Sequence, residues 1–229
     1  MQSNGATIVS IHVGKPAQHG PDAISDKPWE SGIVKQPVTG KIWLDTLNLE
    51  GDGQHDLKNH GGPFRAVLGY SADHYPIWRE ELAYPDLSYG NFGENFTISG
   101  LEESTVCLGD VYAVGESVRL QIAQPRYPCW KLARRNGIKD LTARTEQKGW
   151  GGWYHRVLQT GYVQAGDAYT LIERPYPQYT IALLNDLVTG RRVDADLCRT
   201  LSAIEELSTD WRVKMQRLSE HTLSEDAGS

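Results

Sequence analysis

Short apolar runs separated by Gly and Pro fill the chain before residue 175, a pattern that is typical of strands and loops. Residues 7–13 alternate between apolar and polar side chains, which predicts a half-buried strand. The runs 106–114 and 117–123 flank Gly115-Glu116 and predict a β-hairpin. Further strands are expected over 38–44, where Thr39-Gly40 suits a hairpin turn, and over 157–159 and 169–172.

Two helical segments interrupt these strands. The first is expected over residues 71–83, with Ser71 as the N-cap and Pro85 just beyond the end. A shorter helix is expected around residues 139–146. The first 175 residues therefore predict a mixed α+β fold, a β-barrel-like sheet decorated with loops and helices.

From Tyr179 onward the apolar positions recur with helical period and predict three short helices. This divides the chain into a β-barrel domain over residues 1–175 and a three-helix unit over 176–229. A three-helix unit could be a helix-turn-helix that binds DNA. This unit, however, carries six Lys and Arg against nine Asp and Glu, a net charge of 6 − 9 = −3. An acidic unit is a poor match for phosphate neutralisation, so packing or docking of another protein is the better interpretation.

Composition narrows the choice of protein class. Of 229 residues 39% are hydrophobic, with seven Trp and eleven Tyr, so a folded core is expected. The net charge of −6 argues against a broad nucleic-acid surface. No apolar run approaches the roughly 20 residues that cross a bilayer, and residues 1–5 lack an apolar signal region. We therefore expect a cytoplasmic protein without nucleic-acid or membrane partners.

Three clusters carry the candidate chemistry, at residues 59–65, 92–96 and 124–129. Each places rigid or backbone-exposing residues next to groups that can bind an anion, move a proton or ligate a metal. Their succession, with strand-like segments between them, predicts one site assembled from several loops.

Cys129 is the strongest candidate in the third cluster. It follows Pro128 and lies close in sequence to Arg126 and Lys131, and nearby cations favour the thiolate, which is a nucleophile and a soft-metal ligand. An isolated Cys is more often a small buried apolar residue, as expected for Cys107 and Cys198. The three Cys lie far apart without a C-x-x-C pair, so neither a disulfide framework nor an iron–sulfur cluster is expected.

The first cluster suits an anion. Successive glycines such as Gly61-Gly62 can present backbone N–H groups to an oxyanion, and Lys58, His60 and Arg65 add positive or switchable charge. A plain glycine turn among solvated charges is an equally good interpretation of this cluster alone.

The second cluster offers Glu94 as a proton shuttle and Asn95 as a donor and acceptor, or else a turn that caps the next strand. Asp52, His55 and His60 raise the alternative of a zinc site. The defined zinc spacings are absent, which weakens that alternative.

Taken in order, these motifs resemble the MOSC domain, whose members are relatives of the C-terminal domain of molybdenum cofactor sulfurase. The motifs are Gly51-Asp52, His60-Gly61-Gly62-Pro63-x-Arg65, Phe92-Gly93-Glu94-Asn95-Phe96, Gly109-Asp110 and Gln124-Pro125-Arg126-x-Pro128-Cys129-x-Lys131. The likeness is greatest to the bacterial YiiM type, associated with resistance to hydroxylaminopurine. It extends from about residue 7 to about residue 221 and includes a three-helix tail.

The resemblance implies a β-barrel-like fold, a molybdenum cofactor (molybdopterin), and Cys129 as the metal ligand or sulfur-carrying residue. It makes Glu94 and His60 the candidate proton donors. The residues that it implies for the pterin phosphate and its pocket are Lys58, His60, Gly61, Gly62, Arg65, Asn95, Arg126 and Lys131.

The expected reaction is two-electron reduction of an N-hydroxylated small molecule to the amine, with loss of water. The chain has no nicotinamide or flavin fingerprint, so an external flavoprotein reductase is expected to supply electrons. Two alternatives stay open: a sulfur carrier or cofactor-binding protein that uses Cys129, and a zinc hydrolase that uses Asp52, His55 and His60.

Overall fold

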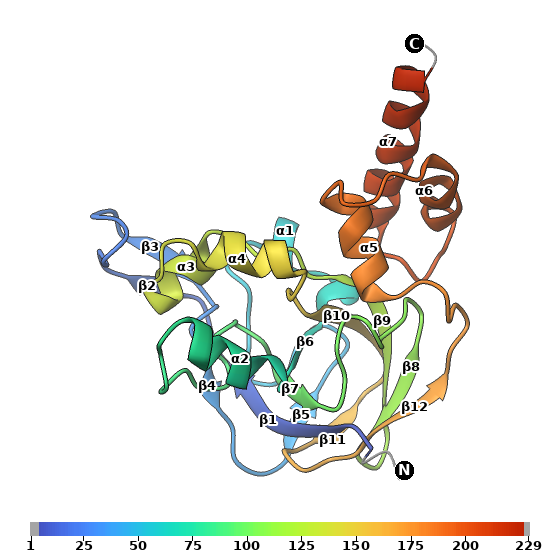
Figure 1. Ribbon diagram of the computed structural model, residues 1–229. Helices are drawn as coiled ribbons and strands as arrows, with labels where there is room; N and C mark the ends of the chain where they lie inside the picture. The colour runs from blue at the N-terminus through green and yellow to red at the C-terminus, as the bar shows by residue number, and fades with distance from the viewer. Residues whose placement is uncertain (1–4, 227–229) are drawn as a thin grey trace.

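An eight-stranded sheet, curled into a half-barrel, forms the centre of the fold (Figure 1). The structure is a computed structural model that describes residues 5–226, with side chains to residue 220. The strands follow the order β12-β8-β9-β10-β6-β7-β1-β4, and all neighbours are antiparallel except β6 and β7. Their bounds are β1 Thr7–Val13, β4 Gln36–Pro37, β6 Val67–Ser71, β7 Phe96–Ser99, β8 Val111–Val114, β9 Val118–Pro125, β10 Trp153–Gln159 and β12 Tyr169–Glu173.

Backbone hydrogen bonds bring the two sides of the half-barrel together. The Ile8 N–H donates to the Asp167 carbonyl over 3.0 Å, and the Tyr169 N–H donates to Ala6 over 2.8 Å. Two short ribbons complete the strands: β2 (Ala17–His19) pairs with β3 (Trp29–Ser31), and β5 (Ile42–Leu44) pairs with β11 (Gly161–Val163). β1 therefore contacts both its sheet neighbours and the turn before β12.

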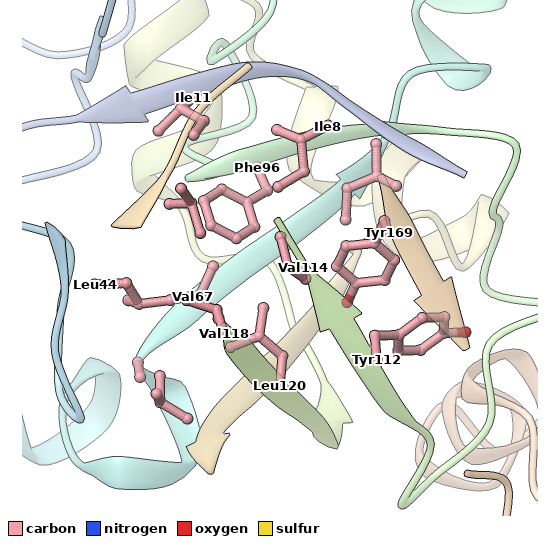
Figure 2. Packing of buried hydrophobic residues seen from close by; sticks show 14 of the residues in the cluster. Ile8, Ile11, Leu44, Val67, Phe96, Tyr112, Val114, Val118, Leu120 and Tyr169 are labelled. Carbon is pink, nitrogen blue, oxygen red and sulfur yellow. The ribbon is translucent and has the colours of Figure 1, made fainter. Parts of the chain in front are cut away.

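The main core lies inside the curl of the sheet. Figure 2 shows Ile8, Phe96, Val114, Leu120 and Tyr169 converging from different strands. All of them are almost completely buried, because each occupies the inward face of its strand. Burial of this apolar surface is the main contribution to the stability of the curled sheet.

A second core, rich in aromatic rings, lies under the helices α2 (His74–Glu81), α3 (Lys131–Asn136) and α4 (Leu141–Lys148). Tyr70 stacks on Phe92 with ring centres 4.4 Å apart, and the Trp78 indole N–H donates to the Tyr70 hydroxyl. The short helices α1 (Leu57–His60) and η1 (Pro63–Arg65) precede β6.

The C-terminal helices α5 (Ile181–Val188), α6 (Ala195–Ser202) and α7 (Thr209–Asp226) gather at one end of the molecule (Figure 1). Main-chain hydrogen bonds attach them to the sheet, among them Leu108 N–H to Tyr179 over 2.8 Å and Ser208 N–H to Ala123 over 3.3 Å. Leu108 itself packs in the apolar cluster of these helices. The division of the chain at residue 175 stays a prediction.

The mixed fold, the strand over 7–13, the β8–β9 hairpin and the three C-terminal helices are confirmed. The hairpin over 38–44 is wrong, because β4 pairs with β1 and β5 pairs with β11. Ser71 ends β6 instead of capping α2, whose N-cap is Asp73. No helix in residues 5–226 is long and apolar enough to cross a membrane.

Candidate functional site

One pocket collects side chains from all three sequence clusters. It contains about 620 Å³ of empty space, including its opening to solvent, and lies where the loop before β4, the segment 52–65 and the loop after β9 meet. Four cations line it: Lys35, Arg65, Arg126 and Lys131. Its other polar side chains include Asp52, His55, Asp56, His60, Asn95, Cys129 and Tyr154.

Cys129 lies in the loop between β9 and α3, and its carbonyl is held from two sides. The Leu132 N–H donates to it over 2.9 Å and the Thr142 hydroxyl donates over 3.2 Å. Cys129 and Lys131 both line the pocket. Cys107 and Cys198 are buried elsewhere, where burial raises the pKa of both thiols.

Arg126 is fixed by backbone carbonyls at the base of the pocket. Its guanidinium donates to Phe92 over 3.1 Å and to Gly151 over 3.4 Å, and only 6% of the residue is exposed. Lys131 is half-buried at the first position of α3, with its Nζ 5.8 Å from the Trp130 ring centre. Arg126 is therefore a fixed part of the pocket wall, whereas Lys131 is a partly exposed side chain that lines the pocket.

Lys35 forms a buried ion pair with Asp52 in the pocket wall. The Asp52 carboxylate also accepts from the Gly14 N–H over 2.8 Å and from the Asn95 side-chain amide over 2.9 Å. Asn95 in turn accepts from the Leu68 N–H over 3.0 Å. Burial lowers the pKa of Lys35, and the field of Asp52 opposes that effect.

His60 and Tyr154 are the titratable groups whose pKa values the pocket shifts in opposite directions. Burial lowers the pKa of His60, and the positive charges of Arg126, Lys131 and Arg65 lower it further. Burial raises the pKa of Tyr154 above its ordinary value of 10, so its hydroxyl stays a proton donor well into alkaline pH. The pocket can thus offer a hydroxyl donor and an imidazole that gives up a proton readily.

Known proteins share this architecture. A sequence model of the MOSC domain matches residues 56–170. The chain belongs to the MOSC domain family. A relative from Bacillus subtilis, the protein YflK, is 38% identical over 97% of this chain and 99% of its own length. The crystal structure of YiiM from Geobacillus stearothermophilus superposes with a TM-score of 0.77, at 33% identity over 93% of this chain and 99% of that one.

A third relative, from Gibberella moniliformis, carries the name "Reductase" and is 38% identical over 169 residues. The match covers 73% of this chain but 30% of that protein. The MOSC-type segment is therefore only a part of that longer protein.

Glu94 lies outside the pocket lining, contrary to the expectation of a proton shuttle there. It is completely buried, and four donors occupy its carboxylate: the Tyr75 hydroxyl, the Thr97 hydroxyl over 2.9 Å, and the N–H groups of Gly90 and Phe92. This saturation makes Glu94 a fixed brace of the loop between α2 and β7.

Gly61 and Gly62 do not present the expected pair of free N–H groups. The Gly61 N–H already donates to the Leu57 carbonyl over 3.1 Å and ends α1, whereas Gly62 turns the chain with φ of 94°. Neither glycine lines the pocket, and neither does the exposed Lys58. Instead, His60 before the turn and Arg65 after it both line the pocket.

The zinc alternative loses its support. Asp52 is engaged by Lys35, Gly14 and Asn95, and the His55 Nδ1 lies 3.1 Å from Glu30. Within residues 5–226, no group of three or more His, Cys, Asp or Glu side chains is arranged to hold a metal ion. A single sulfur ligand beside several cations is a different type of site.

The MOSC pocket fits an anionic cofactor with a thiophilic metal. Arg126 and Lys131 supply positive charge for a phosphate, Arg65 adds a guanidinium that also pairs with Asp210, and Cys129 offers one soft ligand in the same cavity. The charge of Lys35 is balanced by Asp52. Sequence reasoning missed Lys35 and Tyr154. Nothing in the residues around Lys35 marks it, whereas the alternation Trp153-Tyr154-His155-Arg156-Val157 could have placed Tyr154 opposite the core.

Proposed function

We propose that this protein is a molybdenum-cofactor-dependent reductase of N-hydroxylated compounds, such as hydroxylaminopurine-type bases. The observation that carries the proposal is the presence of Cys129 in one cavity with Arg65, Arg126 and Lys131. A thiol surrounded by cations suits a metal whose cofactor bears a phosphate. The family membership supports the same cofactor.

The reaction consumes two electrons and two protons: R–NHOH + 2 e⁻ + 2 H⁺ → R–NH₂ + H₂O. The cofactor, when bound, would supply two-electron redox chemistry. The residues of the chain do the remaining work. Cys129 would hold the metal, and the cations Arg65 and Lys131 would bind the phosphate.

Tyr154 and His60 provide the groups that handle the leaving oxygen. The Tyr154 hydroxyl, which lines the pocket, would donate a hydrogen bond to the substrate N–OH oxygen. His60 relays protons from solvent, because its lowered pKa keeps the imidazole mostly neutral at pH 7 and any proton that it takes up is readily passed on. The proton donor that the sequence suggested at Glu94 is replaced in this scheme by Tyr154.

Electrons have to come from another protein, which we take to be a flavoprotein reductase. No fingerprint for a nicotinamide or flavin occurs in the sequence. The relative named "Reductase" has 100 − 30 = 70% of its length outside the matched segment, which leaves room for an electron-supplying part in the same chain. The cytoplasmic location stays a prediction.

The alternative function is a sulfur carrier or cofactor-binding protein, with a persulfide or the cofactor held on Cys129. Such a carrier has to present its sulfur to a partner enzyme. Cys129 is only partly exposed and lines a pocket whose walls include the fixed side chains of Arg126 and Asn95. This enclosure favours a reaction inside the pocket.

The test begins with metal and pterin analysis of protein purified from a cofactor-proficient host. Molybdenum and pterin at near-unit stoichiometry support the reductase, whereas a persulfide on Cys129 without metal supports the carrier. The loaded protein is then given 6-hydroxylaminopurine with a chemical reductant, with NADH alone, and with NADH plus a flavoprotein reductase from the same cell. We expect turnover in the first and third mixtures. Turnover with NADH and this chain alone would overturn the need for a partner.

A further inference from the structure

We propose that Asp210, on the C-terminal helix α7, orients Arg65 toward the pocket and makes the helical unit a part of the anion-binding site. The Arg65 guanidinium donates to the Asp210 carboxylate over 2.7 Å. Its other hydrogen bond among the described residues, to the Gly61 carbonyl, is 3.5 Å long. Asp210 is thus the stronger of the two restraints on a side chain that lines the pocket.

Asp210 can act as a restraint because the start of α7 is itself anchored. The preceding Ser208 donates its N–H to Ala123 of β9, the strand that leads to Arg126. The next residue, Trp211, is 6% exposed and packs in the apolar cluster of the helical unit. Lys214, one turn further, lies with its Nζ 5.2 Å from the ring centre of Tyr127.

The helical unit does not need the Asp210 carboxylate for its own packing. That carboxylate is 66% exposed, and Arg65 is its one hydrogen-bonding partner in the part of the chain that the structure describes. An acidic residue in the first turn of a helix also favours the helix dipole, which is the competing explanation for Asp210. That explanation predicts an effect on stability and none on anion binding.

A guanidinium has five N–H donors in a planar fork, so one edge can bind Asp210 while another faces a phosphate. Without Asp210, Arg65 has to be ordered by the anion itself. We expect the anion to bind roughly three- to tenfold more weakly, the effect of immobilising one long side chain on binding. The inference rests on the proposed function for the identity of the anion, but the geometry applies to any phosphate.

The experiment compares Asp210→Asn with a matched control, Asp196→Asn. Asp196 is also exposed, lies in the first turn of α6, and pairs with Arg199 over 2.6 Å. Two quantities are measured besides the melting temperature. The first is the rate at which holoprotein loses pterin on dialysis, and the second is the rise in melting temperature that inorganic phosphate gives the cofactor-free protein.

We expect Asp210→Asn to lose pterin roughly three- to tenfold faster and to show a smaller phosphate effect, with Asp210→Glu close to the wild type. Asp196→Asn should match the wild type in both measurements. Equal retention in the two Asn variants would overturn the inference. Slower loss from Asp210→Asn would also overturn it, since Asp210 would then compete with the phosphate. If wild-type protein carries no pterin, the proposed function fails, and the phosphate measurement alone decides the role of Asp210.

Discussion

The buried pair Lys35–Asp52 allows a quantitative test of the pocket wall. Both side chains are nearly inaccessible, at 7% and 1% exposure. In Asp52→Asn the Lys35 ammonium loses its counter-charge in a buried position, a change that costs roughly 3–5 kcal/mol. This cost cannot exceed that of deprotonating Lys35. For a lysine with the ordinary pKa of 10.5, removing the proton at pH 7 costs about 5 kcal/mol.

Because of this limit, the destabilisation caused by Asp52→Asn should depend on pH. A lysine that folds in its neutral form has a lowered pKa, so the unfolded state binds more protons and stability rises with pH up to 10.5. At pH 9 the same deprotonation costs only about 2 kcal/mol. The destabilisation of Asp52→Asn should therefore shrink from about 3–5 kcal/mol at pH 7 to at most about 2 kcal/mol at pH 9.

Urea unfolding at the two pH values measures these differences. Lys35→Met should cost less, roughly 1–3 kcal/mol, because Asp52 keeps the Gly14 and Asn95 donors. The double variant should recover part of the loss of Asp52→Asn. Glu116→Gln is the matched control, since its pair with Lys41 is 53% and 87% exposed and should contribute under about 1 kcal/mol. A penalty for Asp52→Asn below about 1 kcal/mol at pH 7, or one that does not change with pH, would refute this reasoning.

Three further predictions concern the site and the core. Cys129→Ala should abolish reductase activity at nearly unchanged melting temperature, whereas Cys107→Ala should keep most of it; full activity in the first variant would remove the metal-ligand role. Lys131→Ala should lower pterin retention by about 1.5–3 kcal/mol, measured as pterin per protein after dialysis, and is a cleaner test than Arg126→Ala because Arg126 also braces two backbone carbonyls. Burial lowers the pKa of His155 from 6.5 to about 4, so stability that is present above pH 6.5 should be lost as the pH falls through about 4. That loss amounts to about 3 kcal/mol, and urea unfolding of His155→Gln should show a flatter dependence on pH.

Local sequence patterns predicted several strands and helices directly. The strand predicted over residues 7–13 has the bounds of β1, and the turn at Gly115-Glu116 joins β8 to β9. Within β1 the alternation breaks at Val9, which is exposed, because the register shifts between Ile8 and Ser10. The helical period after residue 179 matches α5, α6 and α7. In each case most of the apolar positions are buried, so the local pattern of the sequence reflects burial.

Long-range pairing was not predictable in the same way. Thr39-Gly40 is a good turn sequence, yet β4 and β5 join different neighbours, because pairing depends on what the rest of the fold brings alongside. The candidate site shows the same limit. Cys129, His60, Arg65, Asn95, Arg126 and Lys131, which the resemblance to the MOSC domain implied, all line the pocket. Lys35 has no signal in its own sequence and reaches the pocket through its pairing with Asp52.

The burial of Leu108 among the C-terminal helices has a consequence for synthesis. Its apolar neighbours include Leu184, Leu201 and Trp211, and the last of these is 211 − 108 = 103 residues further along the chain. At about 5–20 residues per second, a ribosome needs on the order of 5–20 s to translate that distance. The last half-barrel strand, β12, ends at Glu173, so even a chain with all its strands translated still lacks the helices that cover Leu108. The nascent chain therefore displays an apolar patch that chaperones can recognise and that the finished protein hides.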